Sequence, residues 1–272
     1  MGANLTGSRR RLQDGGAADA PAPACGPLRA SFDEAIAPRA DPVEVAWYEA
    51  RLPRGAGVLL HPFAGHGRLL IPLSEAGFAL HGVDPSAACL ARCRARLDEA
   101  GRTAELFRQD VWSLNLPFRY AAAFLAPRTF QRLSDRRRAL DALLRIRAHL
   151  VEPGLLLLPF DVPAQAAHPP GAAVVEWRML RLADGSRIAR RSETLIDVAA
   201  RRSEVHSRFE RRHDARVSAR EDEVCEATWY TEEQAAELVA DAGYRDIRRE
   251  SLPSLPPEDG APAQRFALVA RL

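Results

Sequence analysis

Two glycines and an aspartate stand where they could hold a nucleoside. Residues 58–68 read as a buried strand, a turn that contains Gly65 and Gly67, and the start of a helix. Glycines in such a turn let backbone N–H groups approach a ligand at the helix N-terminus. Asp84 ends the next predicted strand, where a carboxylate can accept hydrogen bonds from both hydroxyls of a ribose. The spacing therefore predicts a nucleoside cofactor.

A second carboxylate narrows the choice of cofactor. Asp110 ends a short predicted strand over residues 105–110, where it can accept from the exocyclic amine of adenine while Val111 covers the ring. The dinucleotide fingerprint needs a third glycine at position 70, which is Leu70. This difference disfavours NAD and FAD, and a nicotinamide oxidoreductase ranks behind the two hypotheses given below.

From Asp41 to about Phe160 the chain resembles the class I S-adenosylmethionine-dependent methyltransferases, in particular a small-molecule branch whose glycine motif reads acidic-Pro-x-Cys-Gly-x-Gly-Arg. The matching segments are Trp47-Tyr48, the glycine turn, Ile71-Pro72-Leu73, Gly82-Val83-Asp84, Gln109-Asp110 and the run up to Leu158. The resemblance implies an α/β fold, with a Rossmann-like seven-stranded methyltransferase sheet flanked by helices and an antiparallel β insertion after the fifth strand.

The resemblance also implies the cofactor and the residues that bind it. The cofactor is S-adenosyl-L-methionine; the glycine turn holds its methionine part, Asp84 its ribose and Asp110 its adenine. The expected cofactor-binding residues are His61, Phe63, Gly65, His66, Gly67, Asp84, Pro85, Asp110, Val111 and Trp112. The implied activity is methyl transfer to an O or N atom of a small molecule in specialised metabolism.

Several positions depart from the family pattern. His61 stands where the family usually has an acidic residue that engages the cofactor's amino group, and a neutral imidazole is a poorer partner for an ammonium. Ala64 replaces the usual cysteine and His66 replaces a common Ser or Thr. Residues 120–124 lack the acidic residue that often opens the fourth strand. The alternative hypothesis is therefore a methyltransferase-like fold that no longer methylates and serves as a ligand-binding protein, a scaffold or a repurposed non-redox catalyst.

Methyl transfer asks the protein to exclude water, to align the acceptor and, for O or N acceptors, to remove a proton. The acceptor groups are expected beyond the fourth and fifth strands, in residues 128–132 and around Asp161 and His168. The candidate catalytic residues are His168, His206 and Arg132. An arginine cannot serve as a base near neutral pH, so Arg132 would hold a carboxylate or phosphate of the substrate.

Composition excludes several classes of protein. The 272 residues carry a formal net charge of +2 and are 47% hydrophobic, which suits one enzyme-sized domain and gives no argument for nucleic acid or an acidic membrane. No apolar run reaches the roughly 20 residues that span a bilayer, and the N-terminus lacks a secretory signal. The four cysteines show no metal-binding spacing. All basic residues are arginine, which is typical of GC-rich bacterial genes, and we expect a reduced cytoplasmic protein.

The chain divides into four segments. Residues 1–40 are rich in Ala, Gly, Pro and Arg and are expected to be mostly a disordered tail, and residues 41–160 form the cofactor-binding core. Residues 161–229 alternate apolar and charged positions and form the antiparallel insertion, with a hairpin turn at 183–186 and strands at 174–179, 187–192, 193–198, 204–211 and 224–229. Residues 230–272 supply a helix capped by Thr231 and Gln234 and the last two strands, the final one reversed.

In the resembled enzymes the insertion covers the active site or forms a dimer contact, and the N-terminal helices close over the substrate. A small-molecule acceptor is therefore the expected partner, with a homodimer as a further expectation. Trp47 and Tyr48 either line this pocket or serve only in packing. The identity of the acceptor, the general base and the oligomeric state stay open.

Overall fold

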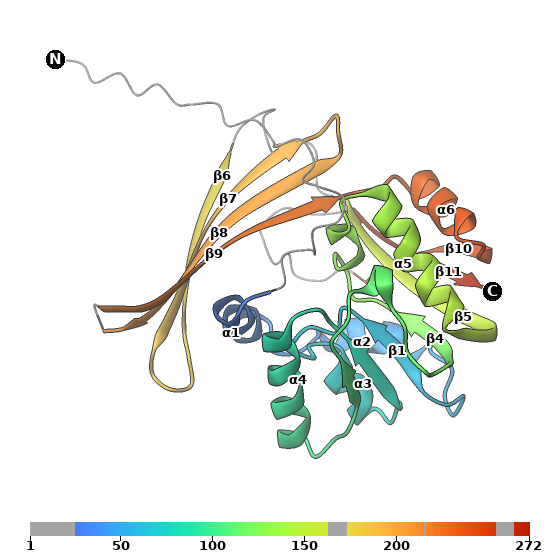
Figure 1. The fold of residues 1–272 in the computed structure, drawn as a ribbon, viewed down its shortest axis with the longest axis horizontal. Coiled ribbons are helices and arrows are strands. Elements are labelled where there is room, and N and C mark those ends of the chain that lie inside the picture. Colours follow the sequence, from blue (N-terminus) through green and yellow to red (C-terminus); the bar gives the residue numbers. More distant parts are fainter. Residues whose placement is uncertain (1–24, 163–172, 215, 254–263) are drawn as a thin grey trace.

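The computed structural model describes residues 25–162, 173–214, 216–253 and 264–272. They form a seven-stranded sheet with helices on both faces and a separate four-stranded antiparallel sheet (Figure 1). This arrangement confirms the predicted fold class. In the described residues, no helix is both long and apolar enough to cross a membrane.

The large sheet has the strand order β10-β11-β5-β4-β1-β2-β3. Its strands are β1 (Leu59–Pro62), β2 (Leu80–Val83), β3 (Glu105–Phe107), β4 (Tyr120–Phe124), β5 (Leu150–Val162), β10 (Arg245–Ser251) and β11 (Gln264–Arg271). Strands β1 to β5 are parallel to one another. Strand β11 is antiparallel to both β5 and β10, as predicted. Because helices cover both faces, β1 and β2 are buried at every position, which explains their continuous apolar runs.

Four of the five helices of the core begin at a side chain that caps them. The five helices are α2 (Pro42–Glu49), α3 (Leu70–Glu75), α4 (Ala87–Glu99), α5 (Arg136–Ala148) and α6 (Glu232–Asp241), with two short 3-10 turns, η1 (Val111–Ser113) and η2 (Phe130–Arg132). Helix α3 begins without a capping side chain. The side chains of Asp41, Ser86 and Asp135 accept hydrogen bonds from backbone N–H groups of the first turns. Thr231 and Gln234 form the predicted capping box of α6.

The insertion forms the second sheet from β6 (Val174–Arg181), β7 (Arg187–Asp197), β8 (Arg202–His213) and β9 (Arg216–Thr228). The predicted hairpin turn between β6 and β7 is correct. Two boundaries were wrong: residues 187–197 are one continuous strand, and β9 begins eight residues before position 224. Ion pairs between neighbouring strands, such as Arg208 with Asp222, let charged residues extend β8 and β9 beyond their apolar parts.

A helix occupies part of the segment expected to be disordered. Helix α1 spans Pro27–Ile36, whereas residues 1–24 lie outside the described residues. The apolar side chains of Leu28 and Phe32 are one turn apart and pack on Ile188 and Phe209 of the second sheet. In Figure 1, α1 lies between that sheet and the end of α4. The composition of the tail concealed this helix because its apolar partners are distant in the sequence.

Candidate cofactor and acceptor site

The ends of β1 and β2 meet at the glycine turn, where Asp84 is held in place. Its Oδ2 accepts a hydrogen bond from the Gly65 N–H at 3.0 Å, and its Oδ1 accepts one from the Ser86 N–H at 2.8 Å. Burial raises the pKa of this carboxyl group, while the backbone donors and the guanidinium groups of Arg132 and Arg29 oppose the rise. The remaining lone pairs of both oxygens can still accept from the hydroxyls of a ribose.

The two glycines of the turn serve different purposes. Gly65 and Gly67 have φ angles of 56° and 86°, a region that glycine adopts without strain. A Cβ on Gly67 would lie 2.8 Å from Cys93 Sγ, so this glycine lets the turn pack against α4. A Cβ on Gly65 would meet no atom of the described residues within 4 Å. The backbone at Gly65 is therefore the part of the turn open to a ligand.

Asp110 lies one strand further along the same edge of the sheet. It follows β3, and its Oδ1 is buried without a hydrogen-bond partner in the described part of the chain. Burial raises the pKa of Asp110, an effect opposed by the guanidinium groups of Arg138 and Arg108. Val111 beside it is fully buried, and the half-buried Trp112 ring lies 5.1 Å from the Arg138 guanidinium carbon. A buried acceptor next to an apolar side chain suits an adenine, whose amine would supply the absent donor.

His61 is neutral and lies in the core at the end of β1. Its Nδ1 is 2.9 Å from the carbonyl oxygen of Phe124, and its ring stacks on the Phe124 ring with centroids 4.5 Å apart. Since a carbonyl can only accept, Nδ1 carries the proton and Nε2 is left as an acceptor. Burial lowers the pKa of His61 to about 4, so this acceptor persists at neutral pH.

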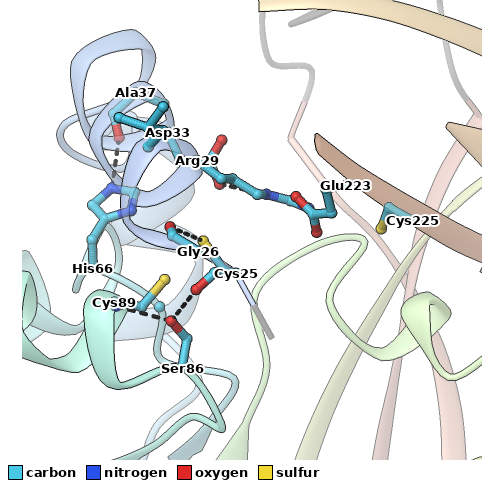
Figure 2. Close-up of polar contacts among 12 residues, drawn as sticks. Cys25, Gly26, Arg29, Asp33, Ala37, His66, Ser86, Cys89, Glu223 and Cys225 are labelled. Atoms are coloured by element: carbon cyan, nitrogen blue, oxygen red, sulfur yellow. Dashed lines mark hydrogen bonds and ion pairs between the residues drawn. The ribbon is translucent and has the colours of Figure 1, made fainter. Parts of the chain in front are cut away.

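The other predicted cofactor residues near the turn are His66, Phe63 and Pro85. His66 is buried, and its Nε2 lies 3.2 Å from the carbonyl oxygen of Ala37, just beyond α1, so its ring contacts the N-terminal segment (Figure 2). Phe63 is half-buried with a φ of 55°, which marks the sharp exit from β1. Pro85, also half-buried, accepts a hydrogen bond from Arg108 through its carbonyl oxygen. The predicted cofactor residues therefore lie together, but His66 faces α1.

A buried ion pair positions the turn. Arg68, the last residue of the motif, donates to both carboxylate oxygens of Glu44 at 2.7 Å, and the Glu44 side chain is only 1% exposed. This bidentate contact attaches α2 to the start of α3. Trp47 and Tyr48 of α2 are buried, and the Tyr48 hydroxyl donates to the Leu125 carbonyl oxygen. The structure therefore supports the packing interpretation of these two aromatic residues.

The three candidate catalytic residues do not lie together in the described part of the chain. Arg132, in η2, lies with its guanidinium 3.8 Å from Glu223. His206 lies on the face of the second sheet opposite to Phe209, which packs on α1, and its Nε2 is bound by Glu204. Strand alternation therefore turns His206 to the face away from α1, and its role as a base stays a prediction. His168 lies outside the described residues.

The acceptor region beyond β4 and β5 is bordered by an ion-pair network. Asp161 near the end of β5 binds Arg128 at 2.8 Å and Arg265 of β11 at 3.2 Å. The Gln131 side chain of η2 donates to the Asp161 carbonyl oxygen and to that of Thr228. These contacts join η2, the large sheet and the end of β9.

Sequence reasoning missed two residues at this place, Arg29 of α1 and Glu223 of β9. Figure 2 shows the Arg29 side chain extending from α1 to the Glu223 carboxylate, with Ser86 below it in the view. Arg29 also contacts Asp33, one turn further along α1. The spacing of Leu28, Phe32 and Ile36 could have revealed the helix, but no local pattern points to its partner on β9.

Comparisons with known proteins agree with this geometry. The family model described as a methyltransferase domain matches residues 60–154, which include the glycine turn, Asp84 and Asp110. A comparison with curated proteins returns no match.

Solved structures similar to the whole chain extend this result beyond residues 60–154. The sugar N-methyltransferase KedS8 from Streptoalloteichus sp ATCC 53650 is 17% identical, with a TM-score of 0.70 and coverage of 96% of this chain and 99% of that one. An S-adenosylmethionine-dependent methyltransferase from Clostridium acetobutylicum ATCC 824 is 16% identical, with a TM-score of 0.66 and coverage of 89% and 96%. CalS10, an amino pentose methyltransferase from Micromonospora echinaspora, is 21% identical, with a TM-score of 0.59 and coverage of 84% and 88%. The large sheet and the second sheet therefore occur together in a fold that is already known.

Proposed function

We propose that this protein transfers a methyl group from S-adenosyl-L-methionine to an O or N atom of a small molecule. The observation that carries the proposal is the buried Oδ1 of Asp110, which has no partner among the described residues and lies on the same sheet edge as Asp84. A buried carboxylate oxygen without a donor is costly, and a bound adenine would remove that cost.

The residues of the site fit the whole cofactor. Asp84 would accept from the ribose hydroxyls, the open backbone at Gly65 would face the methionine part, and the neutral Nε2 of His61 would accept from its ammonium group. When bound, the cofactor supplies a methyl group already activated on a sulfonium sulfur. The chain then has to align the acceptor, exclude water and receive a proton.

Structural neighbours support a small-molecule acceptor. KedS8 is a sugar N-methyltransferase, and CalS10 is an amino pentose methyltransferase involved in calicheamicin biosynthesis. Their folds match most of this chain. We therefore include in the proposal an acceptor of similar size and a place in specialised metabolism. The second sheet and η2, which meet near Gln131, would form the walls around such an acceptor.

A release assay for S-adenosylhomocysteine tests this proposal. The purified protein is incubated with S-adenosylmethionine and a panel of amino sugars, hydroxy sugars and other small amines and alcohols. We expect acceptor-dependent release with at least one class, together with a mass gain of one methyl group on that acceptor. Tight cofactor binding with no release across the panel would contradict the proposal.

His61 favours a second candidate, a site that binds ligand without methylating. Its buried neutral ring cannot supply the charge that an acidic residue offers to an ammonium. If the site is only weakened, His61→Glu should raise the affinity for S-adenosylmethionine, as measured by titration calorimetry. An unchanged affinity in a folded variant would favour the second candidate.

A further inference from the structure

Glu223 is a buried carboxylate with one oxygen unused. Its side chain is 6% exposed and comes from β9, on the face of the second sheet that is turned toward α1. Oε1 is bound by Arg29 and lies 3.8 Å from the Arg132 guanidinium, whereas Oε2 is buried and finds no hydrogen-bond donor in the described ranges. Such an atom implies a donor that binds there.

This carboxylate belongs to the same electrostatic environment as Asp84. The guanidinium groups of Arg29 and Arg132 act on both carboxyl groups: their charges lower the pKa of Asp84, and both lie within ion-pair distance of Glu223. Arg132 lies in η2, the turn that follows β4 and borders the acceptor region. Through Arg132, Glu223 therefore lies next to the acceptor region, at the end of the Arg29 side chain (Figure 2).

Charged groups of both signs lie around Glu223. Three carboxylates, those of Asp33, Asp84 and Glu223, share this environment with the guanidinium groups of Arg29 and Arg132. Within this set the formal charges sum to −1. Asp33 is 38% exposed and screened by solvent, and the other four groups balance in formal charge. What Oε2 of Glu223 lacks is a hydrogen-bond donor, which a ligand amine would supply.

We propose that Glu223 binds the amine of the methyl acceptor and takes its proton, so that the atom methylated is nitrogen. The inference rests on the proposed function and deepens it. In this step an ammonium N–H bond breaks and its proton goes to Oε2 of Glu223. The nitrogen lone pair then forms the N–C bond while the methyl C–S bond breaks, and that electron pair stays on sulfur. The proton on Glu223 afterwards leaves to solvent.

A carboxylate suits an amine better than an alcohol. An alkyl ammonium has a pKa near 10.4, whereas an alcohol is several units less acidic, so a carboxylate base can help only the former appreciably. Burial raises the pKa of Glu223, which brings it closer to that of the ammonium, while the charges of Arg29 and Arg132 oppose the rise and that of Asp33 adds to it. Cys225 lies on the same strand face, two residues away.

Sinefungin provides a test that does not require the natural acceptor. This cofactor analogue carries an amine where S-adenosylmethionine carries the reactive methyl group, while S-adenosylhomocysteine has no group there. Titration calorimetry would measure the Kd of each ligand for the wild type, for Glu223→Gln and for Glu221→Gln. Glu221 is the matched control because it lies on the same face of β9, where it binds the backbone N–H groups of Leu28 and Arg29.

We expect Glu223→Gln to weaken sinefungin about tenfold more than S-adenosylhomocysteine, the effect of losing one charge-assisted contact. Glu221→Gln should change both affinities in parallel. Equal losses for both ligands in Glu223→Gln would overturn the inference and assign Glu223 only to holding α1. If neither ligand binds the folded wild type, the proposed function itself fails and the inference falls with it.

Matched acceptors give the second readout. Each amino sugar in the release assay is paired with the sugar that carries a hydroxyl at the same position. Turnover confined to the amines, with the pH at half-maximal kcat/KM altered in Glu223→Gln, is the expected result. Turnover of the hydroxyl partners at the same rate would support methyl transfer and contradict the assignment of nitrogen.

Discussion

Asp110 is the residue whose surroundings most directly predict a ligand. Asp110→Ala removes the buried, unpartnered Oδ1 and should weaken S-adenosylmethionine about tenfold, the value of one hydrogen bond to a charged acceptor. The free protein should become no less stable, because Oδ1 makes no hydrogen bond with the described residues that the substitution could remove. Titration calorimetry and urea unfolding measure the two effects.

Asp98→Ala is the matched control, since Asp98 is an exposed carboxylate at the end of α4. Its substitution should leave the Kd of S-adenosylmethionine unchanged. Equal affinities of the Asp110 variant and the control would show that Asp110 does not contact the cofactor.

His61 predicts a pH dependence of stability. Its pKa is lowered from 6.5 to about 4 in the folded protein, so protonation favours the unfolded chain. Its contribution is complete above pH 6.5 and is lost as the pH falls from 6.5 toward 4, by up to about 3 kcal/mol. Urea unfolding between pH 7.5 and 4.5 should show a shallower loss of stability in His61→Gln than in the wild type.

His213→Gln serves as the comparison, because His213 is exposed at the end of β8. This variant should follow the wild-type pH dependence. A wild-type slope that persists unchanged in His61→Gln would assign the loss of stability to other groups.

Residue types at strand ends were predictable, whereas their distant partners were not. Asp84 and Asp110 follow apolar strands directly, so a local pattern identifies them. Arg29 and Glu223 lie 194 positions apart in the chain, and only the packing of β9 over α1 brings them together. The face that His206 occupies was equally hard to predict, because a one-residue change along a strand turns a side chain to the other face.

Among the elements, α2 and the glycine turn depend on the Glu44–Arg68 pair. Glu44→Gln removes the charge that the Arg68 guanidinium faces in a buried position and should cost about 3 kcal/mol of stability. Glu49→Gln, which breaks an exposed pair with Arg54, should cost less than about 1 kcal/mol. Urea unfolding of both variants measures the difference, and equal costs would contradict a positioning role for Glu44.

Helix α1 holds the second sheet through Phe32. This side chain is 1% exposed, and its ring centroid lies 5.5 Å from that of Phe209 in an edge contact. Phe32→Ala should destabilise the protein by about 3 kcal/mol, as expected for a cavity in a small apolar cluster. Trp177→Ala on the exposed face of β6 should change stability by less than about 0.5 kcal/mol. A near-neutral Phe32→Ala would mean that α1 is not required for the fold.

The elements that sequence reasoning recovered are those with local signals. Apolar runs located the parallel strands, and the capping box of Thr231 and Gln234 located the start of α6. Helix α1 was missed because its stability comes from Ile188 and Phe209, which no nearby pattern shows. The extents of β7 and β9 were underestimated because their charged residues are paired across strands rather than buried.

For the whole molecule, the central feature is the large sheet, with contacts from α1 to α4 and from the second sheet to η2 beside it. The large sheet places Asp84 and Asp110 after neighbouring strands, and Glu223 of the insertion contacts Arg132, which follows β4. Parallel topology could be inferred from the order of the elements, since helices α3, α4 and α5 connect β1 to β2, β2 to β3 and β4 to β5. The closure of the site by two distant segments depends on tertiary packing alone.

Titration calorimetry with S-adenosylmethionine and S-adenosylhomocysteine, with Asp84→Ala as the control, tests the central claim most directly. The account predicts micromolar binding of both ligands by the wild type and its loss in a folded Asp84→Ala variant, because Asp84 is fixed by Gly65 and Ser86 toward the ribose position. Absence of binding to the folded wild type, or equal binding by the variant, would contradict the proposed cofactor site and the methyl transfer built on it.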